Sequence, residues 1–209
     1  MIIAIVQARN GSTRLPGKIL MDICGKPMLT RVIERVKQST MIDKIVVATT
    51  RLDEDNAVVK LAEDNGVSCY RGEVDDVLTR YYHCASKYIE NPFKDTIVRI
   101  TGDCPLIDPE IIDKAIQYFL DKGYDLVTTT GNYPDGMDIE VFSYNTLERA
   151  WTMARRNDDR EHVTSYMLKH PEIFRVGKLR RNQEYPELKL SVDTQEDLER
   201  VRVIYEKLN

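Results

Sequence analysis

The feature that most constrains this chain is a series of short apolar runs that alternate with segments of helical periodicity. The runs are rich in β-branched residues and cover residues 2–6, 45–48, 96–100 and 126–129. Strands without a polar face are typical of parallel sheets that are covered on both sides. The sequence therefore predicts the open α/β class, with a mostly parallel central sheet and helices on both faces.

The segments between these runs carry their apolar residues on one helical face. Asp108 and Pro109 predict a helix start, as N-cap and first helical residue. Thr194 and Asp197 stand at capping-box spacing and predict the start of the last helix. The predicted apolar faces contain Met28, Val32, Ile33 and Val36, then Ile111, Ile112, Ala115, Ile116 and Phe119, and finally Leu198, Val201 and Ile204.

Residues 131–141 break this alternation. They contain the turn signal Tyr-Pro-Asp-Gly, followed by a short strand-like stretch at 138–142. We expect an insertion over one edge of the sheet, after the fourth core strand. The length of 209 residues suits a single domain over 1–209, with an insertion-like acceptor or dimer region around 131–170.

Composition excludes several classes of function. The formal net charge is −4, and the short basic cluster at 178–181 is interpreted as a solvated loop, so we expect no nucleic-acid partner. The four cysteines show neither close ligand pairs nor a disulfide framework, which favours reduced thiols. The apolar start is too short for a membrane span and lacks a basic leader. We therefore expect a cytoplasmic protein without a membrane partner.

The segment that follows the first predicted strand, residues 7–18, has the composition of a triphosphate-binding loop. Its glycines allow close backbone approach to an anion, and its hydroxyls and cations supply donors. It matches neither the Walker A loop nor the dinucleotide fingerprint. The candidate residues are Arg9, Gly11, Ser12, Thr13, Arg14, Gly17 and Lys18.

Two aspartates stand at predicted strand ends. Asp103 follows the strand at 96–100, and Asp193 follows a short apolar stretch at 188–190. Each has a plain alternative, since Gly-Asp turns are common and Asp193 precedes a helix start. Together they would hold a divalent metal that neutralises a triphosphate, so positioning and electrostatics would carry most of the catalysis.

Four motifs, at residues 8–18, 25–28, 102–106 and 192–198, resemble the CMP-ketodeoxyoctonate and acylneuraminate cytidylyltransferase family. Residues 133–142 and 160–164 look most like the branch named for spore coat polysaccharide biosynthesis, SpsF. The resemblance implies a single-domain nucleotidyltransferase fold of the glycosyltransferase-A type, CTP as donor and Mg²⁺ as cofactor. It also makes a homodimer an expectation.

The resemblance assigns roles to matching residues. Arg14 and Lys18 would contact the β- and γ-phosphates, and Asp103 and Asp193 would hold the metal; these four form the predicted catalytic set. The predicted nucleotide-binding residues are Ala8, Arg9, Gly11, Ser12, Thr13, Arg14, Lys18, Arg71, Gly72 and Asp103. Asp75 and Asp76 would approach the ribose or, on the interpretation we favour, belong to a helix N-terminus.

The acceptor is expected to meet polar residues of the divergent region. Arg160 would bind its carboxylate or phosphate with two parallel hydrogen bonds. His162 remains open between a structural and a functional role, whereas His83 and His170 are interpreted as structural. The predicted acceptor-binding set is Asp135, Asp138, Glu140, Arg160 and His162.

The leading hypothesis is transfer of CMP from CTP to a small anionic acceptor, a sugar acid, with release of pyrophosphate in surface polysaccharide biosynthesis. One alternative is a sugar-transferring glycosyltransferase of the same fold. Such enzymes usually carry an Asp-x-Asp metal motif, where this chain has Gly-Asp-Cys-Pro. The other is a non-catalytic nucleotide-binding protein, which the retained carboxylates and Lys18 disfavour.

Overall fold

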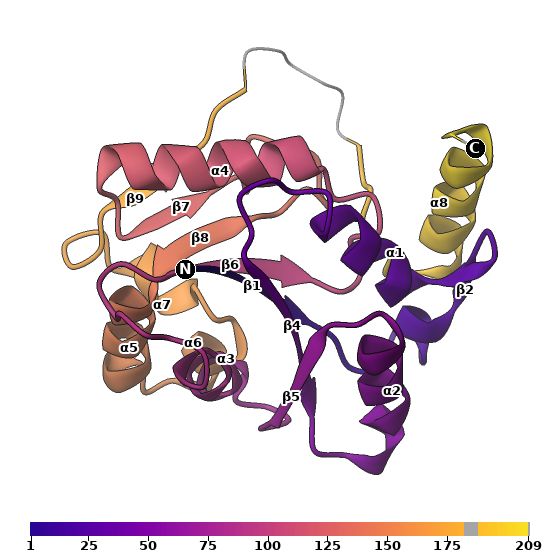
Figure 1. The fold of residues 1–209 in the computed structure, drawn as a ribbon, viewed down its shortest axis with the longest axis horizontal. Helices are drawn as coiled ribbons and strands as arrows, with labels where there is room; N and C mark the ends of the chain where they lie inside the picture. The colour runs from indigo at the N-terminus through magenta and orange to yellow at the C-terminus, as the bar shows by residue number, and fades with distance from the viewer. Residues whose placement is uncertain (182–187, 209) are drawn as a thin grey trace.

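The computed structural model describes residues 1–181 and 188–208 and shows a mixed seven-stranded sheet between helices (Figure 1). The strand order is β5-β4-β1-β6-β8-β7-β9. A separate hairpin consists of β2 and β3. The strands are β1 (Ile2–Gln7), β2 (Asp22–Ile23), β3 (Lys26–Pro27), β4 (Lys44–Thr50), β5 (Ser68–Gly72), β6 (Thr96–Thr101), β7 (Leu126–Thr128), β8 (Glu140–Ser143) and β9 (Val176–Lys178).

The predicted helix starts are confirmed. Asp108 accepts a hydrogen bond from the Glu110 amide, and Thr194 and Asp197 accept from each other's backbone N–H. The helices are α1 (Met28–Val36), α2 (Asn56–Asp64), α3 (Val77–Ser86), α4 (Pro109–Lys122), α5 (Tyr144–Met153), α6 (Asn157–Glu161), α7 (Ser165–Lys169) and α8 (Gln195–Leu208), with 3₁₀ turns η1 (Lys18–Leu20) and η2 (Asp53–Asp55).

The parallel half of the sheet decides where the loops meet. Strand β1 pairs in parallel with β4 and β6, and β4 pairs in parallel with β5. Gln7, the last residue of β1, stands opposite Ala48 on one side and Thr101 on the other. The segments that leave β1 and β6 therefore start side by side at one edge of the sheet.

The expectation of an insertion over the sheet edge is wrong. Strand β8 lies inside the sheet, antiparallel to both β6 and β7. Val141 and Phe142 are fully buried on opposite faces, so this strand has no polar side to offer to water. The strand predicted at 188–190 does not form in the described residues. The backbone of Lys189 pairs with that of Asp135 in a single isolated β-bridge.

Helices cover both faces of the sheet, as the apolar strands predict. Figure 1 shows α3, α5, α6 and α7 on one side, and α1, α2 and α4 on the other. Along β1, Ile3 and Ile5 pack with the first group, while Ala4 and Val6 pack with the second. No helix in the described ranges combines the length and hydropathy that crossing a bilayer requires.

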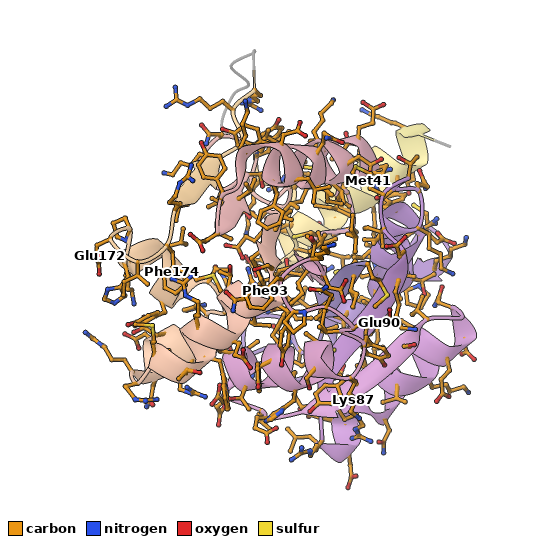
Figure 2. The ribbon with its side chains drawn as sticks, turned by 60° about the vertical axis from the view of Figure 1, so that its left-hand side comes forward. Met41, Lys87, Glu90, Phe93, Glu172 and Phe174 are labelled. Carbon is orange, nitrogen blue, oxygen red and sulfur yellow. The ribbon has the colours of Figure 1, made fainter. Side chains whose placement is uncertain are left out.

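The position of β8 leads to a test of stability. We expect Phe142→Ala to lower the free energy of unfolding by about 3–5 kcal/mol, because it leaves a cavity in a closed core. Phe93→Ala is the matched control, since Phe93 (labelled in Figure 2) is 78% exposed and its loss should change stability by less than about 0.5 kcal/mol. Urea denaturation of both variants measures the difference, and equal losses would contradict the buried position of β8.

Candidate active site

The loop that follows β1 closes on itself. The Asn10 carbonyl accepts hydrogen bonds from the amides of Ser12 and Gly17, at 2.9 and 3.1 Å. The buried Asp55 accepts from the Asn10 amide at 2.6 Å and so holds the start of the loop against the end of β4. Gly17 has a φ of 72°, a left-handed conformation that glycine adopts without strain, and leads directly into Lys18.

Lys18 joins three segments that are far apart in the sequence. Its side chain is largely buried, and Nζ donates to Asp103 Oδ2 at 2.7 Å, to the Val192 carbonyl at 2.7 Å and to Asp193 Oδ1 at 3.1 Å. Arg14 also pairs with Asp193 Oδ1, at 2.8 Å. The structure thus brings together all four residues of the predicted catalytic set.

The electrostatics of Asp193 follow from these contacts. Burial alone would raise its pKa, but hydrogen bonds from Lys18 and Lys189 outweigh burial and hold the pKa of Asp193 below its ordinary value. The carboxylate therefore stays charged at neutral pH.

Close backbone approach is needed where β6 ends. The Gly102 amide donates to the Gln7 carbonyl at 2.8 Å, and a Cβ on Gly102 would lie 2.9 Å from the Ala8 Cβ. Only glycine allows this contact without displacing Ala8. The contact sets Asp103 beside the loop that carries Lys18.

A cavity of about 750 Å³ opens over this edge of the sheet. One side is formed by the 9–18 loop with Asp103 and Asp193, and the other by the start of α3 and by α6. The predicted site residues that line it are Ala8, Arg9, Ser12, Thr13, Arg14, Lys18, Asp103, Arg160, His162 and Asp193.

Three predicted nucleotide-binding residues lie outside the cavity lining. Arg71 donates to the carbonyls of Thr50 and Leu52 and so braces the turn after β4. Gly72 leaves room for the Arg80 side chain, and Gly11 packs beside Glu54. Their direct contact with a nucleotide stays a prediction.

Three predicted acceptor-binding residues also lie outside this lining. Asp135 bridges to the 189–190 segment through its backbone, and Asp138 accepts hydrogen bonds from Thr130 and Gly136. Glu140 is buried and pairs with Arg99. Their contact with an acceptor likewise stays a prediction.

The start of α3 is fixed to α6 by an ion pair. Asp76 caps α3 by accepting from the Thr79 amide at 2.8 Å, as the helix N-terminus interpretation predicts, and it pairs with Arg160 Nε at 2.6 Å. Arg160 also donates to the Thr79 hydroxyl at 2.6 Å. Asp76 and Arg160 both line the cavity, so this pair forms part of its wall.

Sequence reasoning missed several lining residues, including Gln7, Arg80, Thr101 and Asn157. Gln7 and Thr101 are polar residues at the ends of apolar strands, which was a usable signal. Arg80 is 2% exposed, and its guanidinium donates to the carbonyls of Glu73 and Val74. Arg80 lies within α3, and the helical periodicity of the sequence does not indicate which helix residues face a cavity.

The carboxylates fit a divalent cation. Asp103 Oδ2 and Asp193 Oδ1 both contact Lys18 Nζ, at 2.7 and 3.1 Å, so the two carboxylates lie close together. The described ranges contain no cluster of three or more His, Cys, Asp and Glu side chains, so the protein would supply two ligands. Mg²⁺ is commonly held by one or two carboxylates, with water and substrate phosphates completing its shell.

Comparison with known proteins decides the family. A family model for cytidylyltransferases matches residues 3–208. The chain belongs to the cytidylyltransferase family. This cytidylyltransferase is 43% identical over 202 residues to an uncharacterised protein of Methanocaldococcus jannaschii, with 94% of this chain and 79% of that protein covered. It is 36% identical over 213 residues to the spore coat polysaccharide biosynthesis protein SpsF of Bacillus subtilis, with 99% and 87% covered.

Solved structures agree with the assignment. A cytidylyltransferase from Leptospira borgpetersenii superimposes with a TM-score of 0.92 at 34% identity, over 99% of this chain and 87% of that one. A CMP:2-keto-3-deoxy-manno-octonic acid synthetase gives a TM-score of 0.78 at 21% identity over 100% and 99%, a likeness that shows the fold. The expected nucleotidyltransferase fold and the family resemblance are both confirmed.

The cap of α8 gives a pH-dependent prediction. Asp197 is buried, which alone would raise its pKa, but hydrogen bonds from Lys189, two backbone amides and Arg200 hold the pKa well below its ordinary range. The stabilisation is therefore complete above the unfolded-state pKa and is lost as pH falls below about 4. We expect Asp197→Asn to lower the free energy of unfolding by about 1–3 kcal/mol at pH 7 and by less at pH 3.

The matched control is Asp121→Asn, on the exposed face of α4, where Asp121 bonds only to Gln117 among the described residues. Urea denaturation at both pH values measures the two differences. A loss in Asp197→Asn that is the same at pH 7 and pH 3 would show that the charge of Asp197 does not stabilise the fold.

Proposed function

We propose that this cytidylyltransferase moves CMP from CTP to a small anionic acceptor of the sugar-acid class and releases pyrophosphate, in the synthesis of a surface polysaccharide. The observation that carries the proposal is the contact of Lys18 with both Asp103 and Asp193 at the wall of the cavity. Support for the acceptor class comes from a relative in Francisella tularensis, a 3-deoxy-manno-octulosonate cytidylyltransferase that is 32% identical over 220 residues.

The reaction requires one bond exchange. A hydroxyl oxygen of the acceptor attacks the α-phosphorus of CTP, and the bond from that phosphorus to the oxygen bridging to the β-phosphate breaks. Pyrophosphate leaves with the bonding electrons, and the hydroxyl proton passes to solvent. Negative charge grows on the leaving group, and Arg14 and Lys18, which line the cavity, would stabilise it.

The proposal includes Mg²⁺ as cofactor. Asp103 and Asp193 would hold the ion, which would supply additional positive charge next to the triphosphate. In the structure, Lys18 pairs with both carboxylates and Arg14 pairs with Asp193.

The wall at α3 and α6 is the proposed acceptor side. Arg160 is held by Asp76 and Thr79 with its side chain 22% exposed, and His162 lies at the exposed end of α6. Arg160 Nη1 also donates to the carbonyls of Trp151 and Ala154, so within the described residues one of its five N–H groups has no partner. That group would donate to the carboxylate or phosphate, and the two parallel hydrogen bonds expected from the sequence would require Arg160 to release a present partner. The proposed location is the cytoplasm, a reducing compartment that suits four free cysteines.

Activity is tested with the unaltered protein first. We expect CTP, among the four nucleoside triphosphates with Mg²⁺, to raise the melting temperature most. Pyrophosphate release should then require CTP together with a member of a panel of sugar acids and phosphorylated sugars. Turnover of UDP-sugars without any use of CTP would contradict the proposal.

Two variants test the site in the same assay. Asp103→Asn should lower kcat on the order of a hundredfold, because one negative ligand for the cation is lost while an oxygen remains for Lys18. The control Asp64→Asn changes an exposed aspartate at the end of α2 and should leave kcat unchanged. Equal kcat values in Asp103→Asn and the control would show that Asp103 takes no part in catalysis.

We also propose a homodimer whose contact involves the 131–170 region. Met153 and Leu168 in this region are large apolar side chains that are 39% and 42% exposed, and the proposed contact would bury them. Light scattering should give twice the chain mass of 24.2 kDa. Leu168→Glu should shift the protein to a monomer, while Leu120→Glu, at a 49% exposed position on α4, should not; a dimer that survives Leu168→Glu would exclude this surface.

A further inference from the structure

Gln7 lies at the point where β1 meets the cavity. It is the last residue of the strand, it is half-buried, and it lines the cavity. It follows Ile3 and Ile5 in the alternation of the strand, so its side chain belongs to the face covered by α3, α5, α6 and α7. The 9–18 loop and Lys18 leave the strand beyond it.

Arg99 determines how the Gln7 amide is turned. Arg99 Nε donates to Gln7 Oε1 at 3.1 Å. A guanidinium has donors and no acceptor, so the atom that faces Arg99 must be the amide oxygen. The amide nitrogen is therefore turned away from Arg99, and within residues 1–181 and 188–208 no atom accepts a hydrogen bond from it.

Arg99 is itself held in place. Its guanidinium pairs with Glu140, which is 5% exposed, and Glu140 also accepts from the Thr164 hydroxyl at 2.6 Å. Burial acts against the charge of Arg99, but Glu140 outweighs this effect and raises the pKa of Arg99. The donor that orients Gln7 therefore stays charged over the whole range in which the protein is folded.

This network leads to the acceptor side of the cavity. It runs from Gln7 across β6 and β8 to Thr164, two residues beyond His162 and four beyond Arg160. Among the described residues no hydrogen bond joins this network to the side chains of Lys18, Asp103 or Asp193, although the charge of Asp103 contributes to the raised pKa of Arg99. A chain of hydrogen bonds thus connects Gln7 to the segment that follows Arg160 and His162.

We propose that Gln7 is a specificity-determining residue for the acceptor: its amide NH₂ group donates to oxygen atoms of the acceptor, in a direction that Arg99 and Glu140 fix. The inference rests on the proposed function. Arg99 and Glu140 act through Gln7 and are positioning residues.

Fixing an amide in one orientation gives the site a defined preference. Two donors without an acceptor suit a hydroxyl, carbonyl or carboxylate oxygen. An acceptor that lacks the oxygen would leave these donors dehydrated and unpaired, which makes binding weaker. The buried Glu140 would then affect acceptor choice without touching the acceptor.

The test is Gln7→Glu, which keeps an oxygen for Arg99 and removes both donors. We expect the KM for the best acceptor of a panel that includes 3-deoxy-manno-octulosonate to rise on the order of tenfold to a hundredfold. The Kd for CTP with Mg²⁺, measured by calorimetry without acceptor, should change less than twofold. Gln38→Glu, at an exposed position two residues after the end of α1, is the matched control and should change neither value.

The outcomes separate this inference from the proposed function. Absence of turnover by the unaltered protein would contradict the proposed function. An unchanged acceptor KM in Gln7→Glu, or a Kd for CTP that rises tenfold, would overturn the role of Gln7 in acceptor recognition. Gln7→Met, which has no N–H donor and accepts only weakly from Arg99, serves if Gln7→Glu fails to fold and should show the same rise in acceptor KM with an unchanged Kd for CTP.

Discussion

The three contacts of the Lys18 ammonium group are the interaction on which the site depends. One buried cation binds Asp103 after β6, the backbone at Val192 and Asp193 before α8. Without it, two carboxylates would lie close together at low solvent exposure, which is electrostatically unfavourable. The same contacts hold the start of the last helix next to the first loop. Lys18 therefore stabilises the fold and also lies in the candidate active site.

The sheet supplies the frame for this contact by its topology. Parallel pairing of β1 with β4 and β6 brings three strand ends to one edge, where loops can converge on a ligand. Strand β8 then adds a second function, because its antiparallel insertion places Glu140 next to Arg99. A residue far along the chain thereby orients Gln7 at the end of the first strand.

The two walls of the cavity have different physical characters. The loop wall is built from cations and carboxylates, the charges that the proposed triphosphate and divalent cation require. The helix wall holds Arg160 in place through Asp76 and Thr79, a rigid arrangement that suits recognition of one acceptor shape. Related proteins with other acceptors are expected to differ mainly in this second wall, because the phosphate chemistry is common to all of them.

The sequence by itself determined the class of fold, the phosphate loop and the capped helix starts, because these depend on local periodicity and on residues close in the chain. Lys18 was identified from the composition of the loop after the first strand, and Asp103 and Asp193 because each stands shortly after an apolar stretch. The position of β8, the burial of Glu140 and the orientation of Gln7 were decided only by the tertiary structure. A strand inside a sheet and a strand at its edge can have the same pattern of apolar and polar residues. A glutamate that pairs with a buried arginine also has the same local sequence features as a glutamate that faces a ligand.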